Sequence, residues 1–202
     1  MALALLSSAC AFSDLQSARL VGPGRFEVTP GYSSTSVSED GETEKVQNRF
    51  GIQAATGLAP HLDWRLRYEY ASLTNSQEPG VSILGTGPKF RLVEDRVALH
   101  IPVGFAFGGD LESSETWQLQ PTLLFTLPIG DGAEITTSGR GVIWLNSDAE
   151  SLLGANLGLR LSSDLDRWVV RPEIGFLKDP GGQGGTLWQW SVGFSILSSS
   201  GN

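Results

Sequence analysis

The stretch Arg49–Leu73, which reads RFGIQAATGLAPHLDWRLRYEYASL, alternates between apolar and polar residues on both sides of the short segment APH. Every second residue from Phe50 is mostly apolar or aromatic, whereas the residues between them include Arg65, Arg67 and Glu69. A period of two is typical of a β-strand, because successive side chains point to opposite faces of the sheet. The stretch therefore predicts two long antiparallel strands joined by a tight turn, with one apolar face and one charged face.

The same alternation continues along the chain, with almost no helical periodicity and no run of 18 apolar residues that would form a transmembrane helix. Short connections (APH, VEDR, GDG, SDLD) alternate with longer ones (SVSEDGETEK, TNSQEPG, GGDLESSE, NSDAES, KDPGGQGG). An up-and-down barrel has this arrangement when its two rims carry loops of different length. We predict ten strands, at residues 25–37, 44–58, 61–74, 80–93, 96–109, 115–129, 133–146, 149–163, 167–178 and 185–197.

The apolar faces of these strands are bulky, as in the alternate residues of 97–107 and 188–196. Ten such faces would overfill a small closed interior, and they suit the outside of a cylinder in lipid. The polar faces are rich in Arg, Gln and Gly, and the chain has only three Lys against eleven Arg. We therefore predict that apolar residues face outward and polar residues face the lumen. The alternative is an exported lipocalin-like soluble carrier, which would have an apolar interior.

Aromatic residues lie near the ends of the predicted strands, where the two lipid–water interfaces of a membrane favour them. The alternative explanation is that aromatic residues simply favour strands. The aromatic residues predicted to lie at the interfaces are Trp64, Tyr68, Tyr70, Trp117, Trp168, Trp188 and Trp190.

Residues 25–197 resemble the small outer-membrane β-barrels of bacteria, the class with eight to ten strands. The last predicted strand, LWQWSVGFSIL, looks like the terminal strand that such proteins use as an assembly signal. The resemblance implies an all-β, transmembrane, antiparallel up-and-down barrel in the bacterial outer membrane. It also implies contact with outer-membrane lipid and lipopolysaccharide, and insertion by the barrel-assembly machinery.

The chain begins MALALLSSACAF and contains a single cysteine, Cys10, which excludes a disulfide framework. An apolar stretch followed by small residues and cysteine resembles the end of a lipoprotein signal peptide, in which Cys10 would be lipidated. The alternatives are an ordinary signal peptide cut near Ala9, or a buried free cysteine. We predict a signal or lipid-anchor segment with a lead-in at 1–20, and a single barrel domain at 21–202.

Charges are predicted to segregate, because the lumen face carries a basic excess although the whole chain has a net charge of −8. In one interpretation an Arg–Glu–Gln network plugs the narrow lumen. In the other, the basic excess lines a narrow pore that prefers anions. The charged residues predicted to line the lumen are Arg49, Arg65, Arg67, Glu69, Lys89, Arg91, Arg140, Arg160, Arg171 and Glu173, with Glu27, Asp63 and Glu134 beside them.

Other functions have weaker support in the sequence. The negative net charge argues against a nucleic-acid partner, because phosphate contacts need a basic surface. His61 is expected in a surface turn and His100 on the lumen face, and no serine is spaced to form a catalytic pair with either. We therefore predict no enzyme activity, no cofactor and no metal site, and keep a barrel enzyme that uses His100 as the less favoured alternative. The acidic outer loops are the candidate surface for a protein partner.

Overall fold

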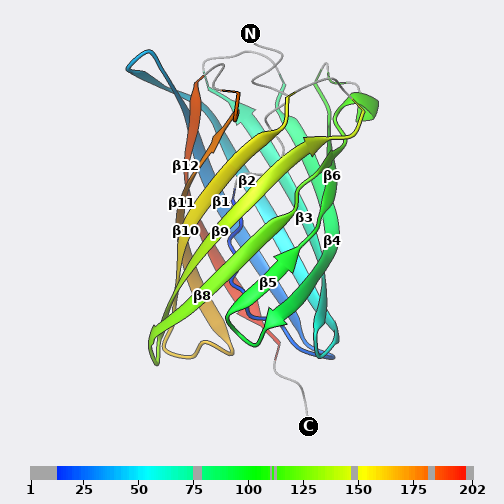
Figure 1. Ribbon diagram of the computed structural model, residues 1–202, viewed down its shortest axis with the longest axis vertical. Coiled ribbons are helices and arrows are strands. Elements are labelled where there is room, and N and C mark those ends of the chain that lie inside the picture. Colours follow the sequence, from blue (N-terminus) through cyan, green and yellow to red (C-terminus); the bar gives the residue numbers. More distant parts are fainter. Residues whose placement is uncertain are drawn as a thin grey trace.

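The computed structural model is a closed antiparallel β-barrel (Figure 1). The structure describes residues 13–74, 79–109, 111, 113–146, 150–181 and 185–198. Within that part of the chain, no helix is long and apolar enough to cross a membrane. The elements are β1 Phe26–Glu39, β2 Glu42–Ala59, β3 Leu62–Leu73, β4 Val81–Val93, β5 Val97–His100, β6 Val103–Phe107, the 3₁₀ helix η1 Ser113–Glu115, β7 Gln118–Leu119, β8 Thr122–Gly130, β9 Ala133–Trp144, β10 Leu152–Leu161, β11 Trp168–Lys178 and β12 Thr186–Leu197.

The barrel closes because β1 pairs antiparallel with both β2 and β12. β5 and β6 both pair with β4 and share one strand position, and β7 and β8 both pair with β9 and share another. The wall therefore has ten strand positions, and every pairing in it is antiparallel. The predicted fold class, an all-β, antiparallel up-and-down barrel with ten strands, is confirmed.

Two of the predicted strands, 96–109 and 115–129, are interrupted where they contain Pro102 and Pro121. Proline has no N–H, so each proline removes one hydrogen bond from the ladder while the strand keeps its direction. The two interruptions affect three neighbouring strand pairs, and one main-chain hydrogen bond crosses the interruption in each pair. The retained bonds run from Ile101 N–H to Pro88 O (3.0 Å), from Gln120 N–H to Pro102 O (2.9 Å) and from Gly141 N–H to Pro121 O (3.0 Å).

The predicted long connection SVSEDGETEK is instead an extended hairpin, and that prediction was wrong. β1 and β2 continue to a two-residue turn at Asp40 and Gly41, whose φ angles are 51° and 83°. Positive φ at both central residues is the geometry of a type I′ turn, which Asp-Gly favours because glycine has no Cβ. The hairpin projects beyond the barrel rim in Figure 1. It carries Glu39, Glu42 and Glu44 in the exposed part of the chain.

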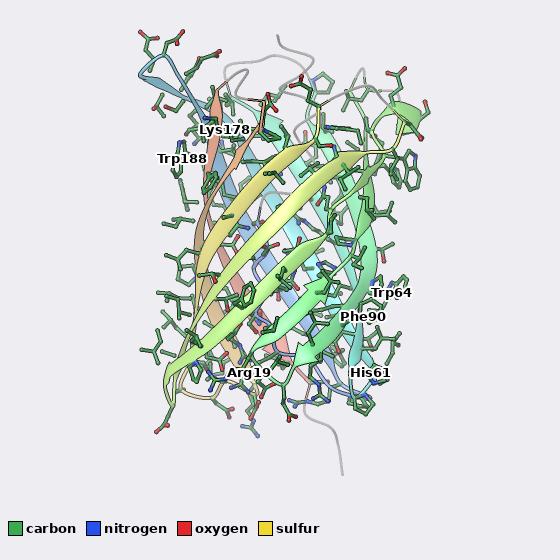
Figure 2. The ribbon with its side chains drawn as sticks, in the orientation of Figure 1. Arg19, His61, Trp64, Phe90, Lys178 and Trp188 are labelled. Carbon is green, nitrogen blue, oxygen red and sulfur yellow. The ribbon has the colours of Figure 1, made fainter. Side chains whose placement is uncertain are left out.

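The outside of the barrel is apolar and the inside is largely polar (Figure 2). Phe50 is 59% exposed and Trp190 is 51% exposed, whereas the large cationic side chains of Arg49 and Lys89 are 1% and 0% exposed. This is the inverse of a soluble protein, and it suits a barrel surrounded by lipid. The predicted orientation of the two faces is confirmed, and it is the opposite of the orientation that a soluble carrier requires.

The interior is not polar along its whole length. Toward the long-loop end, Val81, Ile83 and Ala106 form one buried apolar cluster. A second cluster contains Val142, Leu177 and Leu187. Buried charges lie beside the first cluster, because Glu69 of β3 is the cross-strand partner of Ile83 in β4.

Candidate functional site: the lumen and its N-terminal segment

The lumen contains the chain's own residues 13–21, which we call the lumen segment. Its residues Ser13–Ala18 are all buried. At the short-turn rim, the Val21 N–H donates to Asp63 at 2.8 Å, just after β3 begins. Figure 1 shows this dark blue part of the chain inside the barrel wall. The segment thus leads from the short-turn rim toward the middle of the lumen.

The chain turns from the lumen into the wall at the sequence GPG, residues 22–24. Gly22 and Gly24 have φ angles of 91° and 72°, which residues with a Cβ rarely adopt. A Cβ on Gly57 would lie only 1.8 Å from the Gly22 carbonyl oxygen. The Gly57 N–H donates to Arg25 O at 3.0 Å, and the Gly24 N–H donates to Gly57 O at 3.2 Å. The reversal therefore depends on glycine at both sides of this close approach.

Asp14 fixes the inner end of the lumen segment. Its carboxylate accepts hydrogen bonds from Ser138 Oγ and from the Arg140 guanidinium, and a further one from Asn156 Nδ2 at 2.8 Å. The main-chain N–H groups of Asp14 and Leu15 donate to the Glu173 carboxylate at 2.8 and 2.9 Å. Charge-assisted bonds of this kind are about twice as strong as neutral ones. Asp14 is thus bonded to two neighbouring strands through its side chain and to a third through its main chain.

Leu15 occupies a hollow in the wall that two glycines create. Gly31 of β1 pairs with Gly193 of β12. A Cβ placed on Gly31 would lie 2.6 Å from Leu15 Cδ1, and one on Gly193 would lie 3.1 Å from it. Leu15 is 3% exposed. The absence of a Cβ at these two positions therefore leaves a hollow in the wall that the Leu15 side chain fills.

The outer half of the lumen segment is bonded as closely as its inner end. Lys89 Nζ donates to the carbonyls of Ser17 and Arg19 at 2.6 and 2.7 Å. The Ala18 N–H donates to Thr126 Oγ1 at 2.8 Å. The Arg19 guanidinium pairs with Glu134 at 2.5 Å. Unpaired main-chain polar groups are costly to bury, and the bonds from Lys89 and to Thr126 satisfy three of them in this half of the segment.

The predicted lumen charges form buried ion pairs around this segment. Glu27 bridges Arg65 at 3.2 Å and Arg171 at 2.9 Å. Glu69 pairs with Arg67 at 2.8 Å and lies 3.7 Å from Arg49. The third group joins Arg160 to Glu134 at 3.0 Å, and Glu134 also holds Arg19.

Two of the predicted lumen residues are less enclosed than the others. The side chain of Arg67 is 16% exposed. The side chain of Arg91 is 30% exposed and pairs with Glu94 at 3.1 Å, at the short-turn rim. Arg91 therefore belongs to the rim, because it lies beside the short turn that joins β4 to β5.

Most of the predicted interface aromatics lie on the outside of the barrel. Figure 2 shows Trp188 toward the long-loop end and Trp64 toward the short-turn end, both directed outward. Trp117 and Trp168 are partly covered, because they stack on Phe105 and Phe194 with ring centroids 4.7 and 6.1 Å apart. The exposed members of the set are Trp64, Tyr68, Tyr70, Trp188 and Trp190, at 41–51%. Their contact with lipid stays a prediction.

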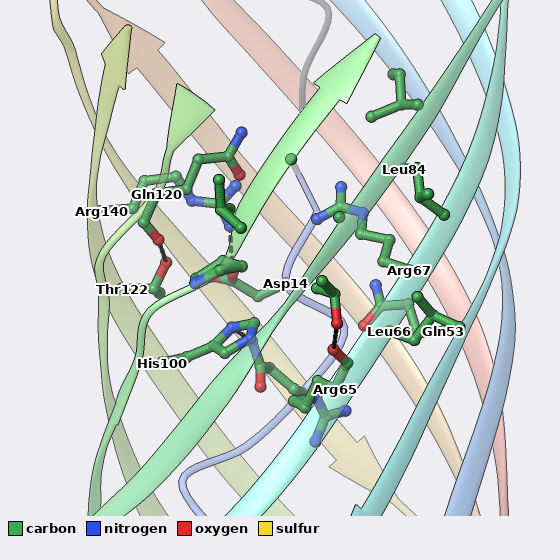
Figure 3. Close-up of a pocket in the computed structure, with 17 residues that line it drawn as sticks. Asp14, Gln53, Arg65, Leu66, Arg67, Leu84, His100, Gln120, Thr122 and Arg140 are labelled. Carbon is green, nitrogen blue, oxygen red and sulfur yellow. Dashed lines mark hydrogen bonds and ion pairs between the residues drawn. The ribbon is translucent and has the colours of Figure 1, made fainter. Parts of the chain in front are cut away.

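A small cavity lies between the lumen segment and the wall (Figure 3). Its volume is about 40 Å³. Figure 3 shows His100, Gln120 and Arg140 on one side of it, and Arg67 and Gln53 on the other. The cavity lies in the charged part of the lumen, beside Asp14.

His100 faces the lumen, as expected, and its partner is an amide. Its Nδ1 lies 3.1 Å from Gln16 Nε2 of the lumen segment, and its Nε2 has no partner in the described part of the chain. No hydroxyl nucleophile is bonded to this ring there. Among the described residues, no group of three or more His, Cys, Asp or Glu could hold a metal ion. Cys10 lies outside the described residues, so its lipidation stays a prediction.

Sequence reasoning missed the lumen segment, which was assigned to the lead-in at 1–20. A signal was present in SDLQSAR, residues 13–19, which is too polar for the apolar core of a signal peptide. The GPG that follows marks a reversal of the chain directly before β1. Nothing in the sequence, however, pairs Asp14 with Arg140 or Leu15 with the two glycines.

No protein-family model matches the chain, and no curated protein matches it. Solved structures of similar architecture include an outer-membrane channel from Pseudomonas putida F1, with a TM-score of 0.49 and 12% identity over 93% of this chain and 99% of that one. The translocator domain of the autotransporter NalP from Neisseria meningitidis has a TM-score of 0.47 and 9% identity over 85% and 87%. Ail of Yersinia pestis has a TM-score of 0.39 and 12% identity over 87% and 99%. Identities this low carry no information about substrate or partner.

Proposed function

We propose that the protein is an outer-membrane barrel of a bacterium whose lumen is closed by its own lumen segment. In this state the barrel is structural and does not conduct. The single observation that carries the proposal is the burial of Ser13–Ala18 inside the wall. A segment bonded through Asp14, Leu15 and Ala18 occupies space that a permeating solute would need.

The width of the barrel supports the same conclusion. Barrels of about eight strands are just filled by their side chains, and wide aqueous channels occur at about 16–18 strands. Ten strand positions leave little room, and ion pairs such as Arg65–Glu27 and Arg160–Glu134 occupy it together with the segment. The remaining cavity of about 40 Å³ has space for a few water molecules, since one water needs about 10–15 Å³.

The second candidate function is a gated, anion-preferring pore. The described wall of the lumen carries seven basic and five acidic side chains, and rings of basic side chains favour anions. Departure of the lumen segment would remove Asp14 and leave this basic excess facing water. The basic residues are Arg49, Arg65, Arg67, Lys89, Arg140, Arg160 and Arg171, and the acidic ones are Glu27, Asp63, Glu69, Glu134 and Glu173.

The outer face of the barrel and its rims support proposals about what surrounds the protein. The apolar exterior would contact outer-membrane lipid, and lipopolysaccharide would surround the long-loop rim. The assembly machinery would insert the chain. The acidic hairpin at Glu39–Glu42 is the proposed surface for a protein partner, because its carboxylates are exposed beyond the rim. No role for nucleic acid or a cofactor enters the proposal.

The test is conductance of the refolded protein in a planar bilayer, after heat-modifiable gel mobility has shown that the barrel is folded. We expect no conductance steps from the unchanged protein or from the control Asp131→Ala, whose side chain is exposed in the β8–β9 turn. The double variant Asp14→Ala, Leu15→Ala loosens the lumen segment, and anion-selective steps from it would support the gated pore. Steady steps from the unchanged protein would overturn the closed barrel. Silence from the folded double variant would reject the gated pore.

A further inference from the structure

The cavity beside Asp14 is rich in hydrogen-bond donors. Its lining includes the guanidinium groups of Arg65, Arg67 and Arg140, and Asp14 supplies the only carboxylate of the lining among the described residues. Each of these arginines also contacts a carboxylate: Glu27, Glu69 and Asp14, respectively. The lining itself therefore carries three guanidinium groups and one carboxylate, and Glu27 and Glu69 balance two of the three positive charges from outside it.

Three donors that line this cavity have no acceptor in the described part of the chain. They are Arg67 Nη2, Gln53 Nε2 and His100 Nε2. Gln53 is 7% exposed, so bulk water does not reach most of it. Arg67 uses its Nε for Glu69, which leaves Nη2 available. Gln16 Oε1 is an unpaired acceptor in the same lining, so the cavity has three unpaired donors against one unpaired acceptor in the described part of the chain. Buried polar groups are almost always paired, so this excess of donors requires a further acceptor.

The bond between His100 and Gln16 determines what His100 presents. The Gln16 amide lies with its Nε2 3.1 Å from His100 Nδ1, and in the tautomer in which Nδ1 accepts this bond the ring proton lies on Nε2. In that tautomer His100 presents an N–H donor to the cavity. Arg67 supplies the charge, and Gln53 and His100 supply neutral donors from other strands, β2 and β5.

We propose that this cavity binds a small inorganic anion of the halide class, held by Arg67, Gln53 and His100. A halide accepts several hydrogen bonds at once, and bonds from a guanidinium to an anion are stronger than bonds between neutral groups. The volume of about 40 Å³ suits one such ion with a small number of waters. The site rests on the closed lumen of the proposed function, because Asp14 and Gln16 complete its lining.

Water alone is the competing occupant, since ordered water satisfies buried polar groups in many proteins. The two occupants differ in one measurable way. A bound halide stabilises the folded protein in proportion to the logarithm of its concentration, because it binds the folded state and not the unfolded one. Water gives no such dependence at constant ionic strength.

The experiment measures the unfolding temperature of the full chain in detergent micelles, with chloride or bromide replacing gluconate at constant ionic strength and pH. We expect the unfolding temperature of the unchanged protein to rise with the logarithm of the halide concentration. Arg67→Met should weaken the apparent halide affinity by about tenfold or more, the loss expected for a hydrogen bond to a charged group. Gln53→Leu should weaken it as well. The control Arg25→Met removes a cation that bonds Ser198 O and Asp166 O outside the cavity, and it should leave the halide response unchanged.

A second measurement needs no variant, so the proposal can be tested even if Arg67→Met fails to fold. Crystals of the unchanged protein soaked in bromide should show anomalous scattering within hydrogen-bond distance of Arg67, Gln53 and His100. Equal unfolding temperatures in chloride and gluconate, with only water density in the cavity, would overturn the halide site. Neither readout uses conductance, so a conducting unchanged protein would overturn the closed barrel separately.

Discussion

The Asp14 carboxylate accepts a hydrogen bond from the Arg140 guanidinium inside the barrel, although 126 residues separate the two in the chain. The contact joins the lumen segment to β9, on the wall. Both side chains are almost fully enclosed, at 5% and 3% exposure. Removing one partner of such a pair leaves an uncompensated charge, which is more costly than the pair itself. The buried charge of Arg140 therefore favours the position of the lumen segment in which Asp14 is its partner.

Asp14→Ala should release the inner end of the lumen segment. We expect amide hydrogen exchange at Leu15 and Ala18 to quicken by about tenfold to a hundredfold, since hydrogen bonds to charged groups contribute about 1.5–3 kcal/mol. These amides report directly, because they donate to Glu173 and Thr126 inside the lumen. Asp131→Ala, in the β8–β9 turn, should leave both rates unchanged. Equal protection in Asp14→Ala and the unchanged protein would show that the pair does not hold the segment.

The packing of Leu15 against Gly31 can be tested by a double-mutant cycle. Gly31→Ala places a Cβ 2.6 Å from Leu15 Cδ1 and should cost about 1–3 kcal/mol of unfolding free energy, as overpacking does. In the background of Leu15→Ala the same change should cost much less, because the clashing atoms are absent. Denaturant titration in lipid gives the four free energies. Gly139→Ala is the matched control, because its Cβ meets nothing within 4 Å. Purely additive costs would mean that Gly31 and Leu15 do not share the site.

Alternation predicted the strands, because its period of two depends only on the order of residues in each strand, and the alternating loop lengths and bulky apolar faces predicted the barrel and its orientation. Phe50 lies outward and Arg49 inward for that reason. The hollow that holds Leu15 could not be predicted in the same way. It requires Gly31 and Gly193 to be paired across the closure between β1 and β12, and no local pattern gives that register.

The orientation of the faces gives a third prediction. Leu123, in β8, lies on the apolar face between the buried residues Thr122 and Leu124. Leu123→Arg should lower the unfolding free energy in lipid by about 2–4 kcal/mol, because it places a charge near the bilayer midplane. The matched control is Ile129→Arg on the same strand and face, one residue before β8 ends. There the cost should fall to about 0–1 kcal/mol. Equal costs at the two positions would contradict the proposed depth of the strand in the bilayer.

The candidate site was partly predictable for the same physical reason as the fold. Arg65 and Glu27 were both predicted to face the lumen, and they form a buried pair. The cavity was not predictable, because it depends on where the lumen segment places Asp14 and Gln16. The interruption of the strands at Pro102 and Pro121 had a clear signal, since proline cannot donate to a ladder.

Glu150 and Asp179 meet at the long-loop rim, outside the strands, and give a prediction on pH. The side-chain hydrogen bond with Asp179, together with its charge, raises the pKa of Glu150 above the ordinary value. The stabilising contribution of this contact is therefore fully present below the ordinary glutamate pKa. It is lost as the pH rises through the raised pKa, because two carboxylates then face each other. Carbon-detected NMR titration of the Glu150 carboxyl measures the midpoint directly.

Asp179→Asn should lower that midpoint toward the ordinary glutamate value, because the neighbouring negative charge is gone while the amide oxygen can still accept from Gly181 N–H. The control is Asp131→Ala in the β8–β9 turn at the opposite rim, which should leave the Glu150 midpoint unchanged. A Glu150 midpoint that is the same in Asp179→Asn and the unchanged protein would show that Asp179 does not set its pKa. A downward shift would show that the contact between the β9–β10 and β11–β12 loops is stronger in acid and weaker as the pH rises.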